Sequence, residues 1–203
     1  MLVEQALRYL PILPIFLVSL TIHEYAHGWM AYRYGDDTAK RLGRLTLNPL
    51  VHISLFGTII LPLIVQFGWA KPVPVNFAVL TKREVFKVAA AGPAANILMA
   101  ATLAAAFHIF RLKAFPALSN FVLLAIFFNL ILAVFNLLPI PPLDGSKMVF
   151  ARLQSPESIN TYRNFARYGM FVLIGFFVLG GSRLILPVVA LLYVLLRLPP
   201  LIL

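Results

Sequence analysis

Two histidines and a glutamate in the first part of the chain have the spacing of a metal site. His23 and His27 stand four residues apart, and Glu24 follows the first directly. On a helix, residues i and i+4 share one face, so both imidazoles can turn a nitrogen to one metal ion. Glu24 lies about 100° further round the helix, near enough to reach water beside the metal. The pattern predicts hydrolytic zinc chemistry, in which Zn²⁺ lowers the pKa of water to about 7 and Glu24 takes its proton.

The surroundings of this pattern favour a metal over its alternative, a pair of histidines in a polar seam between helices. Residues 9–22 are almost entirely apolar and carry no charge. Polar side chains at the end of such a segment are costly unless they line a protected or wet cavity. We therefore expect one zinc ion per chain.

Composition places the chain among integral membrane proteins. Its 203 residues suit a single domain, 61% of them are hydrophobic, and the mean hydropathy is +0.91. Cysteine is absent, which excludes disulfides and thiolate zinc sites. The net charge of +10 comes from short basic clusters between apolar runs. That pattern is typical of cytoplasmic loops and contacts with anionic headgroups, and we expect no nucleic-acid partner.

The apolar runs predict an all-α polytopic membrane protein with about five to six membrane helices. We interpret residues 1–203 as one transmembrane domain, with a core at 5–146 and a surface segment plus a C-terminal helical hairpin at 147–203. The expected helices cover residues 5–34, 86–110, 118–138, 168–181 and 184–198.

Between the first two core helices we expect short pieces at the membrane surface. Residues 38–50 alternate basic or polar with apolar side chains, which predicts a short strand. Residues 53–67 are too short to cross the bilayer twice and are predicted to be re-entrant or interfacial. Prolines make residues 71–79 extended.

A third zinc ligand is needed, and Asp144 is the acidic residue best placed to supply it. It follows the 118–138 helix directly, in a turn bounded by proline and glycine. An unpaired carboxylate in that position is costly, and a metal would neutralise it. The alternative is an aspartate that caps a turn or helix, as in any Leu-Asp-Gly sequence.

A shared metal would also fix the topology. If His23 and Asp144 bind one ion, the helices at 5–34 and 118–138 run in the same direction and 86–110 runs the opposite way. Thirteen of the 17 Lys and Arg residues then lie on the side of the metal. By the positive-inside rule, we expect a multi-pass protein of the cell membrane whose active site opens toward the cytoplasm.

Three motifs follow one another along the chain. They are His23-Glu24-x-x-His27, Gly92-Pro93-Ala94-Ala95-Asn96 and Asn136-x-x-Pro139-x-Pro141-Pro142-Leu143-Asp144-Gly145. In this order they resemble the site-2 protease family of intramembrane zinc metalloproteases, peptidase family M50. The resemblance is to the compact form, without a PDZ or CBS domain. Leu47-Asn48-Pro49 with His52 fits the compact members too, although Ser54 stands where many of them have an acid.

The resemblance implies a zinc metalloendopeptidase that hydrolyses peptide bonds of transmembrane helices within the bilayer. Matched position by position, His23, His27 and Asp144 are the zinc ligands and Glu24 is the general base. Asn136 matches the asparagine that holds the substrate or the oxyanion, and its amide can donate to a developing negative charge. A hydrogen bond between helices is the alternative role for Asn136.

Two further residues are expected to support the site. Asn96 matches the asparagine of the second motif, and we favour a structural role for it in its helix. His52 could hydrogen-bond near the site or be a transient metal ligand, and we favour a supporting or structural role for it.

The implied partners are a transmembrane protein substrate and the lipid bilayer, and the sequence leaves a homodimer or a regulatory membrane partner open. Two other functions compete with proteolysis. A zinc transporter would use histidines and an aspartate as a transit site, but it usually shows paired repeats and several sites along a path. A non-catalytic membrane binding protein would have no use for Glu24.

Overall fold

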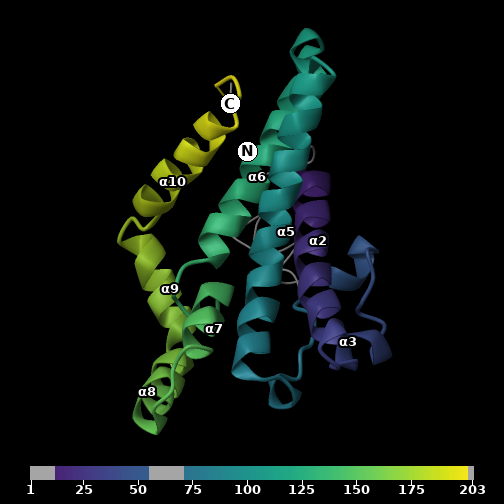
Figure 1. The fold of residues 1–203 in the computed structure, drawn as a ribbon. Coiled ribbons are helices and arrows are strands. Elements are labelled where there is room, and N and C mark those ends of the chain that lie inside the picture. Colours follow the sequence, from purple (N-terminus) through teal and green to yellow (C-terminus); the bar gives the residue numbers. More distant parts are fainter. Residues whose placement is uncertain (1–11, 55–70, 201–203) are drawn as a thin grey trace.

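The structure is a computed structural model that describes residues 12–54 and 71–200 as helices and connecting segments (Figure 1). The predicted re-entrant piece at 53–67 falls almost wholly outside the described residues. The α-helices are α2 (Ile12–Arg33), α3 (Thr38–Arg41), α5 (Lys82–Ile109), α6 (Pro116–Asn136), α7 (Asp144–Phe150), α8 (Pro156–Arg167), α9 (Gly169–Val178) and α10 (Ser182–Leu195). The 3₁₀ helices are η1 (Pro49–His52), η3 (Phe77–Val79) and η4 (Leu112–Ala114).

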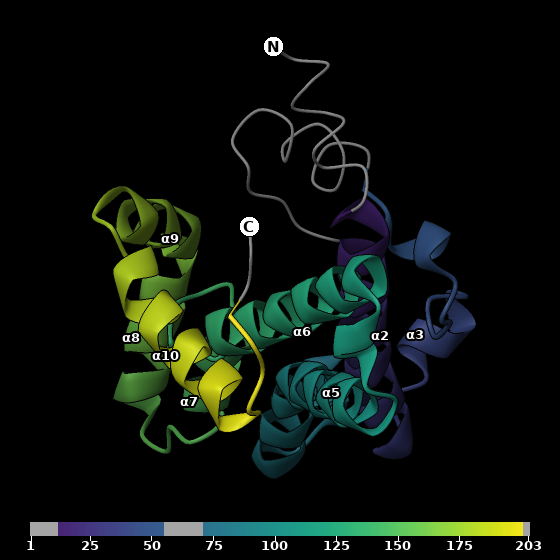
Figure 2. The same cartoon turned by 90° about the horizontal axis from the view of Figure 1, so that it is seen from above.

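Three long helices, α2, α5 and α6, form the centre of the molecule. Figure 1 shows α5 running opposite to α2 and α6, which is the topology that a metal shared by α2 and Asp144 requires. Seen from above, α8, α9 and α10 lie on one side of α6 while α2 and α3 lie on the other (Figure 2). The central trio therefore brings residues far apart in sequence to one place.

The start of α5 shows why this helix begins four residues before the predicted position 86. Thr81 is its N-cap, and the Thr81 side chain accepts a hydrogen bond from the backbone N–H of Glu84. The Glu84 carboxylate in turn accepts from the backbone N–H of Thr81 at 2.8 Å. This reciprocal capping satisfies two backbone donors that the first turn leaves free.

The number of membrane helices is lower in the described residues than the five to six predicted. Two helices, α5 and α6, are long and apolar enough to cross a membrane, and α9 with α10 makes a third if the pair is one bent span. The predicted hairpin of two crossings is wrong, because α9 and α10 meet at a bend of 79° rather than folding back antiparallel. At 1.5 Å per residue they are only about 15 Å and about 21 Å long, too short to cross alone.

No strand occurs among the described residues, so the predicted surface strands are not found there. Within 38–50, the chain instead forms α3 and then enters η1. Asn48 caps η1, since its side-chain oxygen accepts from the backbone N–H of Leu50 at 3.1 Å. Alternating polar and apolar residues make a strand only where a neighbour takes up the backbone hydrogen bonds, and this stretch satisfies its groups locally.

Alanines let the central helices approach closely. Ala100 and Ala104 of α5 are buried against Ile126 and Leu130 of α6, and Val189 of α10 joins the same apolar cluster. Small side chains at such contacts are typical of membrane helices, whose association depends on close packing. The result is a fixed frame that leaves one end of α2 and the start of α7 facing each other.

A buried aspartate ties the segment 71–76 to the end of α2. Asp36 is 2% exposed; its carboxylate accepts from the backbone N–H of Thr38 at 3.0 Å and of Asn76 at 2.7 Å. Burial alone would raise the pKa of Asp36, but hydrogen bonds from Thr38 and Asn76 outweigh it and lower the pKa. The ionised form therefore holds this segment in place.

We predict that Asp36→Asn destabilises the protein by about 1–3 kcal/mol, because a charged acceptor of two buried N–H groups is lost. Because the native pKa is lowered, this stabilisation is fully present above the ordinary pKa of about 3.9 and declines as the pH falls through the lower native value. Thermal unfolding in detergent micelles from pH 7 to pH 3 measures both effects.

The matched control for this prediction is the neighbouring Asp37→Asn. Asp37 forms an ion pair with Arg41 at 3.0 Å, but its side chain is 49% exposed. An exposed pair contributes little, so this change is expected to cost less than about 1 kcal/mol. Equal losses for the two variants would contradict the role of Asp36.

Candidate metal centre

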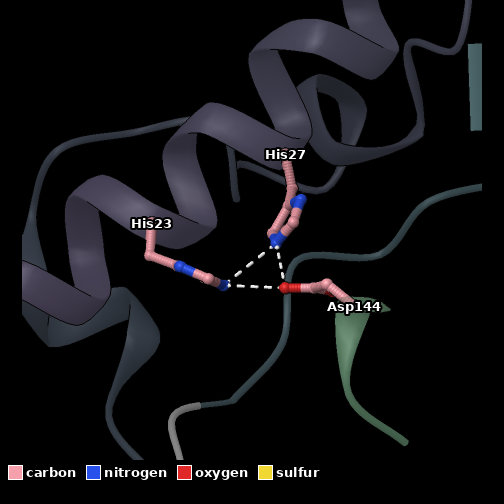
Figure 3. A group of neighbouring side chains, drawn as sticks. All are labelled: His23, His27 and Asp144. Carbon is pink, nitrogen blue, oxygen red and sulfur yellow. Dashed lines mark hydrogen bonds and ion pairs between the residues drawn. The ribbon is translucent and has the colours of Figure 1, made fainter. Parts of the chain in front are cut away.

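Three buried side chains from two distant parts of the chain point toward one another (Figure 3). His23 and His27 lie on one face of α2, and Asp144 is the first residue of α7. The two Nε2 atoms are 3.0 Å apart, and Asp144 Oδ2 lies 3.1 Å from His23 Nε2 and 3.0 Å from His27 Nε2. All three residues are less than a tenth exposed. The structure thus brings together the three predicted ligands.

The other nitrogen of each ring has its own acceptor. His27 Nδ1 donates to the backbone carbonyl of Val88 at 2.7 Å, and His23 Nδ1 donates to the side-chain oxygen of Asn96 at 2.6 Å. A neutral imidazole has one proton, so both Nε2 atoms present a lone pair. Two lone pairs and a carboxylate oxygen converge, an arrangement that a cation among them stabilises.

The triangle of these three atoms fits zinc. Its sides of 3.0, 3.1 and 3.0 Å are nearly equal. Tetrahedral zinc, with bonds of about 2.0–2.1 Å, separates its ligand atoms by about 3.3 Å. Two imidazoles and a carboxylate are also a ligand set typical of hydrolytic zinc, which leaves one position for water or substrate.

The second oxygen of Asp144 is held by a lysine. Lys147 lies one turn further along α7, and its ammonium donates to Asp144 Oδ1 at 2.8 Å. Oδ2 remains for the two histidines. Both residues line a cavity of about 510 Å³, together with His23 and His27. The cavity gives a ligand or water access to the triangle.

Glu24 lines the same cavity and has one oxygen fixed. Its Oε2 accepts from the backbone N–H of Val73 at 2.7 Å. Val73 stands between Pro72 and Pro74, and proline has no backbone N–H. Val73 is therefore the one residue of these three that can donate a backbone hydrogen bond. The Val73 side chain is buried where Gly28 of α2 leaves room for it. The segment 71–76 therefore holds the predicted base beside the metal site.

Asn136 also lines the cavity, and its predicted role in holding the substrate or the oxyanion stays a prediction. Its side-chain nitrogen donates to the carbonyl of Leu132 in the preceding turn of α6 at 2.9 Å. An amide nitrogen has two protons, so one remains to donate into the cavity.

The two residues predicted to support the site differ in their positions. Asn96 is fully buried and bonds His23 directly, a closer connection to the site than the structural role we favoured. His52 is buried, its Nε2 lies 3.0 Å from the carbonyl of Thr46, and it does not line the cavity. The backbone carbonyl of His52 accepts from Lys71 N at 2.9 Å, which connects η1 to the segment that carries Val73. A supporting role for His52 stays a prediction.

Four contributors were not among the predicted site residues, although Gly92 opens the second motif. Val73 acts through its backbone, which no side-chain pattern signals. Gly92 lies where a side chain would meet both histidines. Ser19 and Asn129 are buried and bond Asn96 from behind. The sequence does carry a signal for Asn129, because an amide inside an apolar membrane helix is costly unless it has partners.

Comparison with known proteins gives consistent matches. A profile of Peptidase family M50 matches residues 11–115 and 108–180. YwhC of Bacillus subtilis (strain 168), named as a candidate zinc metalloprotease, is 45% identical over 153 residues, which cover 70% of this chain and 69% of YwhC. No solved structure matches the chain.

More distant matches are longer proteins. Rip2 of Mycolicibacterium smegmatis is 31% identical over 164 residues, or 78% of this chain and 63% of Rip2. Rip3 of Mycobacterium tuberculosis (strain H37Rv) is 30% identical over 174 residues, or 84% of this chain and 38% of Rip3. Both are also named as candidate zinc metalloproteases.

We predict that Gly92→Ala weakens zinc binding at least about tenfold, the lower end of the range seen when groups around a metal are disturbed. The added Cβ would lie 2.7 Å from His23 Nε2 and still closer to His27 Nε2. Alanine is a better helix former than glycine, so α5 itself should not be weakened. Competition with a zinc chelator measures the affinity, and circular dichroism checks the helices.

Gly175→Ala is the control for this substitution. Gly175 lies in α9, where an added Cβ would meet nothing within 4 Å. This variant should bind zinc like the wild type. Wild-type affinity in Gly92→Ala would contradict the geometry described above.

Proposed function

The chain belongs to peptidase family M50, and from this we propose that it is an intramembrane zinc metalloendopeptidase that cleaves transmembrane helices of membrane-protein substrates. One observation carries the proposal. His23, His27 and Asp144 converge, with Glu24 beside them, in one cavity between apolar helices. Metal ligands and a base in such a setting suit hydrolysis away from bulk water.

The proposed ligands are the Nε2 atoms of His23 and His27 and the Oδ2 atom of Asp144. Zinc, when bound, supplies a Lewis acid that polarises a carbonyl and lowers the pKa of water at the site to about 7. Val88 and Asn96 keep the two rings in the tautomer that frees Nε2, and Lys147 holds Oδ1 of Asp144 so that Oδ2 faces the histidines.

Glu24 is the proposed general base. Its Oε2 is occupied by the N–H of Val73, and Oε1 is left to take the proton of the attacking water and pass it to the leaving amine. Asn136 supplies the proposed oxyanion contact through the amide proton that its bond to Leu132 does not use.

The substrate is proposed to be held extended beside the segment 71–76. A helical peptide bond is shielded by its own hydrogen bonds, so a substrate helix must unwind locally. Among the described residues, the N–H of Val75 and the carbonyls of Val73 and Pro74 have no hydrogen-bond partner. These groups offer a short edge for backbone pairing, and apolar residues such as Leu173 also line the cavity.

The apolar helices indicate a membrane protein, and the orientation of the protein in the membrane is part of the proposal. The structure has two or three helices that can span a membrane among the residues it describes. Basic residues gather at the end of the molecule where α2 ends and α5 begins, including Arg33, Lys82 and Arg83. By the positive-inside rule we propose that this end, and the active site near it, faces the cytoplasm. We also keep the proposal of one transmembrane domain over 1–203.

A zinc transporter is the less favoured function. Transport sites usually occur several times along a path through the membrane. In the ranges 12–54 and 71–200, only His23, His27 and Asp144 form a group of three metal-binding side chains. A single centre beside a carboxylate base favours hydrolysis.

We predict that Glu24→Gln lowers cleavage of a single-span model substrate by about 10²–10⁴-fold, the range typical of a lost general base. The glutamine oxygen can still accept from Val73 N–H, and the three ligands are untouched, so about one zinc per chain should remain. Zinc content and cleavage are measured on the same liposome preparation.

Glu157→Gln is the control, because Glu157 is an exposed carboxylate in the first turn of α8. It should cleave like the wild type. Cleavage that survives Glu24→Gln would overturn the role of Glu24. Absence of zinc from the wild type would overturn the metal centre.

A further inference from the structure

Behind His23 lies a chain of buried polar groups that crosses all three central helices. Asn96 of α5, Asn129 of α6 and Ser19 of α2 are each no more than 2% exposed. Asn96 Nδ2 donates to Asn129 Oδ1 at 2.8 Å, and Asn129 Nδ2 donates to Ser19 Oγ at 2.9 Å. None of these groups lines the cavity, so they touch neither substrate nor metal.

Two backbone carbonyls set the direction of every bond in this chain. Asn96 Nδ2 also donates to the carbonyl of Ser19 at 3.2 Å, and Asn129 Nδ2 donates to the carbonyl of Ala125 at 2.8 Å. A carbonyl can only accept, so each of these contacts requires an amide nitrogen. The oxygen of Asn129 must then face Asn96, and the oxygen of Asn96 must face His23.

Neither amide has a spare proton. Both protons of Asn96 Nδ2 and both protons of Asn129 Nδ2 are used, and the oxygen of each amide accepts one bond. Turning either amide over would place an oxygen against a carbonyl oxygen in a buried site. Unpaired polar groups cost most where water cannot replace the lost partner.

The two histidines are therefore anchored differently. His27 Nδ1 bonds directly to a backbone carbonyl, that of Val88, which cannot rotate away. His23 Nδ1 bonds to a side chain, and an isolated amide could present either its oxygen or its nitrogen. The tautomer of His23 therefore depends on the two acceptors that hold Asn96 in place, which are the Ser19 carbonyl at 3.2 Å and, by the shorter bond of 2.8 Å, Asn129 Oδ1.

We infer that Asn129, itself held by Ser19, is a positioning residue that fixes the amide of Asn96 and through it keeps the proton of His23 on Nδ1. This inference rests on the proposed function, since it gives His23 the Nε2 lone pair that zinc requires. It assigns a role at the metal centre to two residues that do not touch the metal ligands.

The test replaces Asn129 with leucine, which is of similar size and cannot hydrogen-bond. The full chain, in detergent, is labelled with ¹⁵N-histidine, which gives signals from four residues only. After chelator treatment, the ring-nitrogen spectrum reports the tautomer, and a His23→Gln variant assigns the signals of His23. In the wild type, His23 should be protonated on Nδ1. In Asn129→Leu, we expect a mixture with the Nε2 proton and a zinc affinity about 10–100-fold lower.

Three further variants make the result specific. Ser19→Ala removes the acceptor of one Asn129 proton and should shift tautomer and zinc affinity in the same direction, by a smaller factor. Thr21→Val and Ser119→Ala are controls, because both residues are buried in the same helices, α2 and α6, outside this chain of bonds. Both should keep the wild-type tautomer and affinity. Thermal unfolding confirms that each variant is folded.

The outcomes separate this inference from the proposed function. A His23 signal that stays on Nδ1 in Asn129→Leu would overturn the inference, and weakened zinc binding with an unchanged tautomer would show a packing role instead. A wild type that binds no zinc would overturn the proposed function, while the tautomer measurement would still decide the role of Asn129.

Discussion

The structure depends on three electron-rich atoms held about 3 Å apart on residues that are less than a tenth exposed. Two imidazole nitrogens and a carboxylate oxygen do not gather in an apolar interior without compensation. Much of the fold provides that compensation. Val88 and Asn96 of α5 accept the Nδ1 protons of the rings, and α7 brings Asp144 together with the ammonium of Lys147. Zinc binding and the relative placement of these helices should therefore be strongly coupled.

The contact between α2 and α5 is made by residues spaced four apart on each helix. Ser19, His23 and His27 follow one another at i, i+4 and i+8 on α2, so they share a face. Val88, Gly92 and Asn96 do the same on α5, which runs the opposite way. His27 therefore meets Val88, Ser19 meets Asn96, and Gly92 lies between, where the two rings need space. The helix without a ligand thus shapes the site as much as the one that carries two.

The sequence predicted those features that depend on a single segment, and it did not predict those that depend on contacts between segments. The spacing of His23 and His27 is a property of one helix, and apolar runs located α5 and α6 to within a few residues. The predictions of surface strands and of a C-terminal hairpin do not match the described residues. Strand pairing and the angle between two helices depend on contacts with distant segments, which the sequence of one segment does not reveal. An amide inside an apolar helix signals that Asn129 needs partners, but only the packing of three helices shows that these are Ser19 and Asn96.

The contact between Glu24 and Val73 separates two properties that often change together. The donor is a backbone N–H, so it is present whichever residue other than proline occupies position 73. Val73 lines the cavity, and its side chain packs against Gly28 of α2. Sequence change at 73 can therefore alter the shape offered to a substrate while the carboxylate beside it keeps its anchor. Specificity and the placement of the base can vary independently at one residue.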